Sequence, residues 1–275
     1  MGRAQKIICF VFGAGIFLGM VACTGNPRSG ESWKNRAVYQ QVQKEESVLL
    51  FPEQKDRSPR LNLKFALLDL SGSKAEGQFL QNVLYGQNTP DEYKEKVIRE
   101  YTDEYFQMRE AVAQNPDFFG ESLNWFYSEI MERTAIFSRG IGIRWSREYY
   151  TGGAHGMREA EYFILDLAAM KRLKLEDLIK PGSEPALMEE VVFALRDLSN
   201  LDGDAPLSSG NYFEDTVEVP QNFFINSRGL GFHWDPYEIA PYAVGPIEIL
   251  IPYDKIKNLL TPQGLSIIDN IKDLE

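Results

Sequence analysis

The sequence predicts an α+β fold in which mostly antiparallel sheets pack against a few helices. In residues 61–70, LNLKFALLDL, apolar side chains recur at period two, as in a strand with one buried face. The triplet Ser227-Arg228-Gly229 separates two short apolar runs, which indicates a hairpin. Strand runs are joined by short turns, and helical stretches stand between groups of strands, which is typical of the α+β class.

In the front half, residues 38–50 and 61–70 are expected to be strands, and residues 75–85 a short helix. A longer helix should begin at Thr89, because Thr89-Pro90-Asp91-Glu92 combines a capping threonine, a first-turn proline and a glutamate three residues on. Apolar residues then keep helical spacing, and we interpret this stripe as core: Tyr93, Val97, Ile98, Tyr101, Tyr105, Met108 and Val112.

The back half is expected to be mainly strands. The expected strands cover 123–137, 141–150, 161–167, 173–175, 223–226, 230–234 and 247–251, and the expected helices cover 184–200 and 253–260. This change of texture suggests two consecutive sub-domains, an N-terminal one over residues 36–120 and a C-terminal one over residues 121–275.

The first residues resemble a bacterial lipoprotein signal. Arg3 and Lys6 precede a short apolar run that ends in Met20-Val21-Ala22-Cys23, similar to a lipobox. We therefore expect a signal peptide over residues 1–22, acyl chains such as palmitate on Cys23, and a polar tether over residues 23–35. The protein would then be anchored to the extracytoplasmic face of a bacterial membrane. A plain secretory signal with a chance cysteine is the alternative.

Cysteine use and charge restrict the chemistry that we expect. The chain has two cysteines, of which Cys9 would leave with the signal peptide and Cys23 would carry lipid, so no thiolate metal site or disulfide is expected. Without residues 1–22 the chain keeps 27 basic and 40 acidic residues, a net charge of −13. This charge argues against a nucleic-acid partner and is compatible with a basic protein partner. We expect no cofactor.

The stretch YYTGGAHG, residues 149–156, is the first candidate site. Gly152 and Gly153 permit a positive φ angle in a tight connection between strands, with His155 bonded to a nearby carbonyl. A binding role and a general-base role for His155 are the alternatives. A metal site is not expected, since only His233 offers a second imidazole and no H-E-x-x-H spacing is present. His233 itself is expected on a half-exposed strand face in a structural role.

The stretch DPYEIAPYAVGP, residues 235–246, is the second candidate site. Its prolines should stiffen the loop, and its tyrosines are efficient contact residues, so Tyr237, Glu238, Pro241 and Tyr242 are candidate binding residues. The alternative is that Tyr237, Ile239 and Tyr242 fold back over the edge of a sheet as packing.

Three stretches in this order resemble a known bacterial family: YYTGGAHG, FILDLAAMKRLKLEDLIKPG and FFINSRGLGFHWDPYEIAPYAVGPIEILIPYDKI. They are similar to the RsiV-type extracytoplasmic C-terminal domain, long labelled as of unknown function. The front half resembles the domain that precedes it, which also occurs in PdaC peptidoglycan deacetylases outside their catalytic part. The best-understood members are anti-sigma factors whose outer domain binds lysozyme. Here no cytoplasmic segment is expected before the signal peptide, so only the outer binding role carries over.

Together these features predict a non-catalytic cell-envelope lipoprotein that binds a protein or a glycan, with lysozyme-like muramidases as the leading partner class. One alternative is a cell-wall hydrolase with His155 as its base. Another is a structural accessory subunit of an envelope complex.

Overall fold

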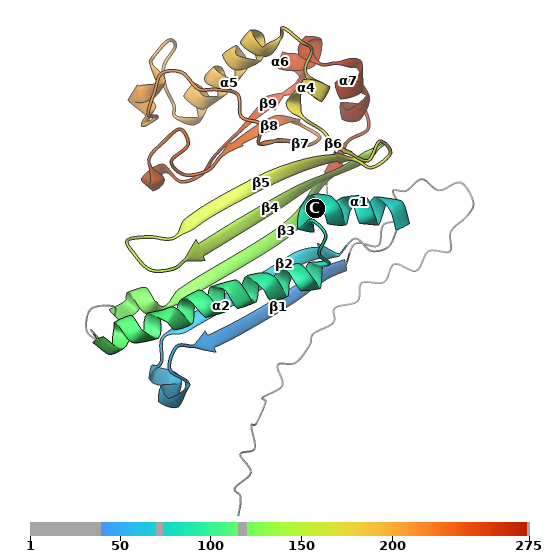
Figure 1. Cartoon of the computed structure of the whole chain (residues 1–275). Helices are drawn as coiled ribbons and strands as arrows, with labels where there is room; N and C mark the ends of the chain where they lie inside the picture. Colours follow the sequence, from blue (N-terminus) through green and yellow to red (C-terminus); the bar gives the residue numbers. More distant parts are fainter. Residues whose placement is uncertain (1–39, 70–73, 115–119, 274–275) are drawn as a thin grey trace, which may run out of the picture. The chain divides into compact units, whose positions relative to one another are not determined.

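A seven-stranded sheet organises the first part of the protein (Figure 1). The computed structural model describes residues 40–69, 74–114 and 120–273. The expected signal peptide, the lipidation site Cys23 and the tether lie outside the described residues. The strands of this sheet are β1 (Gln40–Leu49), β2 (Arg60–Asp69), β3 (Trp125–Phe137), β4 (Gly140–Tyr150), β5 (Met157–Asp166) and β6 (Lys171–Arg172), in that order, with β10 (Lys272–Asp273) paired to β3.

All pairings in this sheet are antiparallel except that of β2 with β3. These two strands are joined by α1 (Lys74–Tyr85) and α2 (Pro90–Gln114). A parallel pair requires a long crossover, because a tight turn reverses the direction of the chain. The two helices supply that crossover, and the mostly antiparallel α+β class expected from the sequence is confirmed.

Helix α2 begins with the capping residues expected from the sequence. The Thr89 hydroxyl oxygen accepts a hydrogen bond from the backbone N–H of Glu92 (3.2 Å), and the Glu92 carboxylate accepts one from the backbone N–H of Thr89 (2.8 Å). The backbone N–H and the hydroxyl of Thr89 both donate to the Glu92 carboxylate, and these two bonds lower the pKa of Glu92. The helix lies over β1 and β2 (Figure 1). Its apolar stripe faces the first core, with Tyr105 fully buried.

A smaller sheet and several helices form the second core. The sheet consists of β7 (Phe223–Ile225), β8 (Gly229–Trp234) and β9 (Ile247–Pro252), all antiparallel, and α5 (Glu184–Leu198) packs on β9. Shorter helices complete this part: α4 (Leu175–Leu178), α6 (Tyr253–Ile256) and α7 (Pro262–Ile268), with 3₁₀ turns at Leu207–Gly210, Tyr242–Val244 and Lys257–Leu259. The first part has 3₁₀ turns at Pro52–Arg57 and Gly120–Leu123. Strand β7 contacts β5, so the second core is built against the large sheet.

The expected sub-domain boundary at residue 120 falls inside the large sheet. Strand β3 follows that point, yet it pairs directly with β2. The described residues form one compact unit. The two cores meet at β3 and β5: Met131 and Leu165 belong to the first, whereas Phe137 and Ile164 belong to the second. Residue 120 therefore lies between helix α2 and strand β3, and strands from both sides of this point belong to the same sheet.

Three local expectations differ from the structure. The expected strand 173–175 does not form: the two-residue β6 ends at Arg172, and α4 begins at Leu175. The expected helix 253–260 is α6 followed by a 3₁₀ turn. Helix α7 was not expected, although Thr261 caps it by accepting a hydrogen bond from the backbone N–H of Gly264. Among the described residues, no helix combines the length and apolar character needed to cross a membrane.

Candidate functional site

The first candidate stretch forms the turn between β4 and β5. Gly152 and Gly153 have φ angles of +96° and +95°, which non-glycine residues rarely adopt, so their predicted conformational role is confirmed. The side chain of His155 is exposed on this turn. Its Nδ1 donates to the carbonyl oxygen of Gly156 at 2.9 Å, as expected, and this leaves Nε2 free for another contact.

The second candidate stretch leaves the end of β8 as a braced loop. The backbone N–H of Tyr237 donates to the carbonyl of Ala240 (3.1 Å), and that of Phe213 donates to the carbonyl of Ile239 (2.9 Å). Tyr237 has a φ angle of +75°, a left-handed conformation that is strained for a residue with a side chain. The loop therefore holds Tyr237 in a conformation that an unbraced chain would rarely adopt.

The structure brings these two stretches together. The His155 ring stacks on the Tyr242 ring with a centroid distance of 3.7 Å and an interplanar angle of 16°. The Nε2 of His155 lies 3.1 Å from the Tyr237 hydroxyl, and the Tyr237 and Tyr242 rings are 5.7 Å apart. We call His155, Tyr237 and Tyr242 the ring platform. It joins residues that are more than eighty positions apart in the sequence.

The ring platform lies at the surface. Tyr237 is 50% exposed, and two other exposed apolar side chains stand in or beside the loop, Val244 at 45% and Phe213 at 52%. Of the three residues that the packing alternative placed over the sheet edge, Ile239 does pack against the second core. The Tyr237 ring instead faces solvent and His155.

The other two candidate loop residues are positioned differently. The Glu238 carboxylate accepts a hydrogen bond from the backbone N–H of Asp235 (2.6 Å), which closes the first turn of the loop. Pro241 is exposed and precedes the 3₁₀ turn that carries Tyr242. Both residues shape the loop, and the rings provide its contact surface.

His233 anchors the base of this loop, and the expectation that it is half-exposed is wrong. Its side chain is 1% exposed, because β8 is covered by the second core on one face and by β5 on the other. The ring hydrogen-bonds to Asp235 (2.9 Å) and Glu248 (2.8 Å). Burial alone lowers a histidine pKa, but these two carboxylates outweigh it and raise the pKa of His233 to about 9. The imidazole is therefore protonated at neutral pH and donates to both partners.

This buried cation connects the loop to the large sheet. Asp235, which accepts from His233, also accepts from the backbone N–H of Ala160 in β5 (2.9 Å). Glu248 also accepts from the hydroxyl of Tyr162 (2.8 Å). Burial raises the pKa of Glu248, and the bonds from His233 and Tyr162 outweigh that effect, so the pKa is lowered overall. The sequence pattern did not predict this cluster, since its partners come from three strands.

A polar groove begins beside the turn that carries His155. Its volume is about 350 Å³, and it is lined by Ser128, Ile130, Arg144, Ser146, Arg147, Glu148, Arg158, Glu159, Ala160, His233 and Pro246. The ion pair closest to the turn joins Arg158 to Glu148 at 2.9 Å. Charges of both signs line the groove, and none of the ring-platform residues does.

A second buried ionisable group lies in the first core. Glu129 is fully buried and accepts hydrogen bonds from the hydroxyls of Tyr93 (2.9 Å) and Tyr127 (2.6 Å) and from the indole N–H of Trp145 (2.6 Å). Burial raises the pKa of Glu129, while these donors and the positive charge of Arg147 oppose the rise. This network supports the sheet beneath the polar groove, and only the three-dimensional contacts reveal it.

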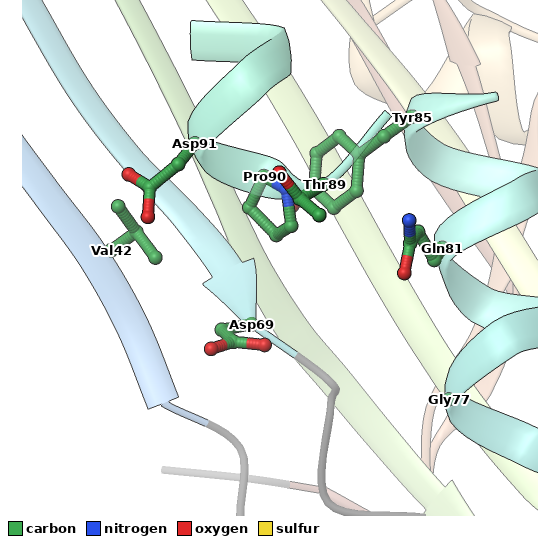
Figure 2. A pocket seen from close by; sticks show the side chains of 8 residues that line it. All are labelled: Val42, Asp69, Gly77, Gln81, Tyr85, Thr89, Pro90 and Asp91. Carbon is green, nitrogen blue, oxygen red and sulfur yellow. The ribbon is translucent and has the colours of Figure 1, made fainter. Parts of the chain in front are cut away.

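A separate cavity of about 270 Å³ lies at the start of α2 (Figure 2). Asp69 and Asp91 contribute carboxylates to its lining, and Asp91 is paired with Lys94 at 2.6 Å. None of the predicted site residues lines it. Within residues 40–69, 74–114 and 120–273, no group of three or more His, Cys, Asp or Glu side chains is arranged to hold a metal ion.

Comparison with known families matches the part of the chain that contains the loop. A family model described as "Protein of unknown function (DUF3298)" matches residues 176–254. Within the matched stretch lie the candidate loop, His233 and Glu248, whereas the turn with Gly152, Gly153 and His155 precedes it. The ring platform thus combines residues of the stretch that is similar to DUF3298 with the β4–β5 turn.

Two solved structures share the fold of this chain. A DUF3298 family member from Bacteroides fragilis superposes with a TM-score of 0.71 at 22% identity, covering 84% of this chain and 97% of that one. A DUF3298 family protein from Pseudomonas aeruginosa gives a TM-score of 0.55 at 20% identity, covering 84% and 98%. At these identities the likeness is one of fold.

The immunogenic proteins MPT64 of Mycobacterium tuberculosis and MPB64 of Mycobacterium bovis are 30% identical to this chain over 111 residues. The matched stretch is 40% of this chain and 47% of each relative. The chain therefore spans about half the length of these relatives.

Neither tyrosine of the ring platform belongs to a buried core: Tyr237 is exposed and Tyr242 is partly exposed. We therefore expect Tyr237→Ala and Tyr242→Ala each to change the free energy of unfolding by less than about 1 kcal/mol, because substitutions outside the core have small effects. A buried aromatic ring would instead cost roughly 3–5 kcal/mol. Thermal and urea unfolding of both variants measure this, with Phe232→Ala as a fully buried control in the stretch that is similar to DUF3298. A loss as large as that of the control would place the rings in the core.

Proposed function

We propose that the protein is a non-catalytic cell-envelope lipoprotein that binds a protein or a glycan through the ring platform. Lysozyme-like muramidases are the first candidate partners. The observation that carries this proposal is the stacked arrangement of His155, Tyr237 and Tyr242 on two braced connections, in which His155 and Tyr237 are exposed and Tyr242 is partly exposed. The RsiV-type resemblance supplies the partner class, and Cys23 supplies the lipid anchor in the bacterial envelope.

The geometry of the ring platform favours recognition. Tyrosine rings cover apolar area and present a hydroxyl, which suits both protein surfaces and the faces of sugar rings. The stacking on His155 and the hydrogen bonds of the loop fix the rings before a ligand arrives, so less conformational entropy is lost on binding. The His155 imidazole is hydrogen-bonded to a carbonyl and a phenol, and this supports a positioning role for the ring over a general-base role.

Charge supports a basic partner. The whole chain has a net charge of −11, and residues 23–275 have a net charge of −13. An acidic binding protein attracts a basic enzyme over distances of about a Debye length, roughly 10 Å at 0.1 M salt. The association rate with such a partner should therefore fall as salt is added.

Titration of the purified protein with lysozyme tests the proposal. We expect saturable binding with a dissociation constant below about 100 µM, and a loss of about tenfold to 200-fold in affinity for Tyr237→Ala or Tyr242→Ala, as for hot-spot residues. Calorimetry gives the affinity, and stopped-flow mixing at two salt concentrations gives the rate. Soluble peptidoglycan fragments provide the glycan arm of the same experiment.

Phe193→Ala is a matched control, because Phe193 is an aromatic residue of α5 that is 63% exposed and outside the ring platform. This variant should bind like the unchanged protein. Lysozyme and the fragments both failing to bind would remove the proposal. If Phe193→Ala lost as much affinity as the two tyrosine variants, the ring platform would not be the binding surface.

A further inference from the structure

The two long edges of the large sheet differ in whether other groups occupy their backbone hydrogen-bonding groups. At the β5 edge, side chains occupy the backbone groups: the N–H of Ala160 donates to Asp235 (2.9 Å), the carbonyl of Ala160 accepts from Asn222 (2.7 Å), and the N–H of Tyr162 donates to Asn222 (2.9 Å). A further strand cannot pair where these bonds exist. Capping of this kind is one way in which proteins protect a sheet edge.

The opposite edge is β1, which is ten residues long and pairs with β2 on one side. Across the described segments of the chain, no strand pairs with its other side. A long edge strand presents a row of backbone donors and acceptors, and such a row is a template for strand addition.

The residues of β1 are self-complementary. Val42, Lys44, Glu46 and Val48 share one face, and each is partly buried. Whether β1 is followed from Val42 or from Val48, this face presents an apolar residue, two residues of opposite charge and a second apolar residue. When two copies of β1 run antiparallel with Glu45 on the two-fold axis, each Lys44 lies opposite Glu46 of the other copy, and each Val42 lies opposite Val48.

We propose that β1 is a homodimerisation edge to which β1 of a second copy adds in this antiparallel register. The register forms two Lys–Glu pairs and two Val–Val pairs on one face, and directly opposed pairs of these kinds stabilise sheets. A two-fold axis makes the interface identical on both copies, which is the commonest arrangement in soluble oligomers. The two copies of Glu45 meet on the other face, where each lies 3.6 Å from a lysine, Lys64.

The charges explain why the partner is a second copy. Charged side chains on an edge normally discourage strand addition. Lys44 and Glu46 form an ion pair at 3.3 Å within one copy of β1. A second copy of β1 places a further opposite charge across from each of them, whereas a foreign strand of different sequence does not. The same residues thus oppose foreign strands and accept their own sequence.

Charge exchange at the edge tests the proposal. Sedimentation equilibrium of the full chain in density-matched detergent, from about 1 to 300 µM, should show a reversible monomer–dimer equilibrium. Lys44→Glu and Glu46→Lys should each weaken dimerisation about tenfold or more, because each converts two opposite-charge pairs into like-charge pairs. The double variant Lys44→Glu/Glu46→Lys restores both pairs and should return within a few-fold of the unchanged chain. Glu45→Gln should strengthen dimerisation by removing the like pair on the axis.

Glu46→Lys separates this register from general repulsion. It makes the chain less negative, so repulsion between acidic copies would predict stronger association, whereas the β1 register predicts weaker association. Lys96→Glu in α2 is the matched control for Lys44→Glu, since it changes the net charge equally away from the edge. Circular dichroism of each variant checks that it is folded.

Three outcomes would overturn the proposal. One is a monomer at every concentration. Another is a dimer whose strength does not respond to residues 44–46. The third is a dimer that Glu46→Lys strengthens or that the double variant fails to restore, since either result places the interface elsewhere.

Discussion

Replacing Glu129 with alanine is expected to lower the free energy of unfolding by roughly 3–5 kcal/mol, because it leaves buried donors without acceptors. The hydroxyls of Tyr93 and Tyr127 and the indole N–H of Trp145 all donate to this one carboxylate. Burial also raises the pKa values of both phenols, so they remain protonated and need an acceptor. Urea unfolding monitored by tryptophan fluorescence measures the loss.

Two variants bracket this result. Glu129→Gln keeps one carbonyl acceptor and should lose less stability than the alanine variant. Glu132→Ala is a matched control on the same strand, because its exposed side chain makes only a 3.7 Å ion pair with Arg144 and should contribute less than about 1 kcal/mol. If Glu129→Ala were no more destabilising than Glu132→Ala, the buried network would have little role in stability.

The stability of the protein is expected to fall by roughly 3 kcal/mol as the pH rises from 6.5 to above 9, through the titration of His233. The pKa of His233 is raised from 6.5 to about 9 in the folded protein by its bonds to Asp235 and Glu248, which outweigh burial. A raised histidine pKa means that the folded state binds the proton more tightly than the unfolded state. This stabilisation is complete below pH 6.5 and is lost as the pH passes through 9.

Unfolding of His233→Gln over the same pH range provides the comparison. A neutral glutamine cannot carry the proton, so the variant should be less stable at pH 6 and should show a much smaller slope between pH 6.5 and 9. His155→Gln is the matched control, since His155 is the other histidine of the chain and its side chain is exposed. Parallel slopes for the unchanged protein and His233→Gln would assign the pH dependence to other groups.

His233 supports both the stability of the protein and the position of the candidate loop. His233 holds Asp235, Asp235 holds the backbone of β5, and Tyr237 follows two residues later. Substitution of His233 should therefore weaken ligand binding as well as stability, whereas substitution of Glu129 acts on the other core. The two variants separate support of the loop from support of the sheet.

Local patterns were sufficient to predict most of the strands and helices, although α7 was missed. The alternation of Leu61, Leu63 and Phe65 predicted β2, and the capping residues Thr89 and Glu92 predicted the start of α2. Glycines at 152 and 153 predicted the positive φ angles of the β4–β5 turn. Each of these features depends on residues a few positions apart, so the information lies within one short stretch of sequence.

Tertiary structure alone decided which of these elements meet. The parallel pairing of β2 with β3, the contact of His155 with Tyr242, and the burial of Glu129 and His233 all join residues from separate strands, helices or loops. A carboxylate or an imidazole can be buried only where partners satisfy it, and those partners come from other elements. The sequence by itself determined most strands and helices and the β4–β5 turn, and it located both candidate stretches. The contact between these stretches, and the burial of Glu129 and His233, depend on packing between residues far apart in the sequence.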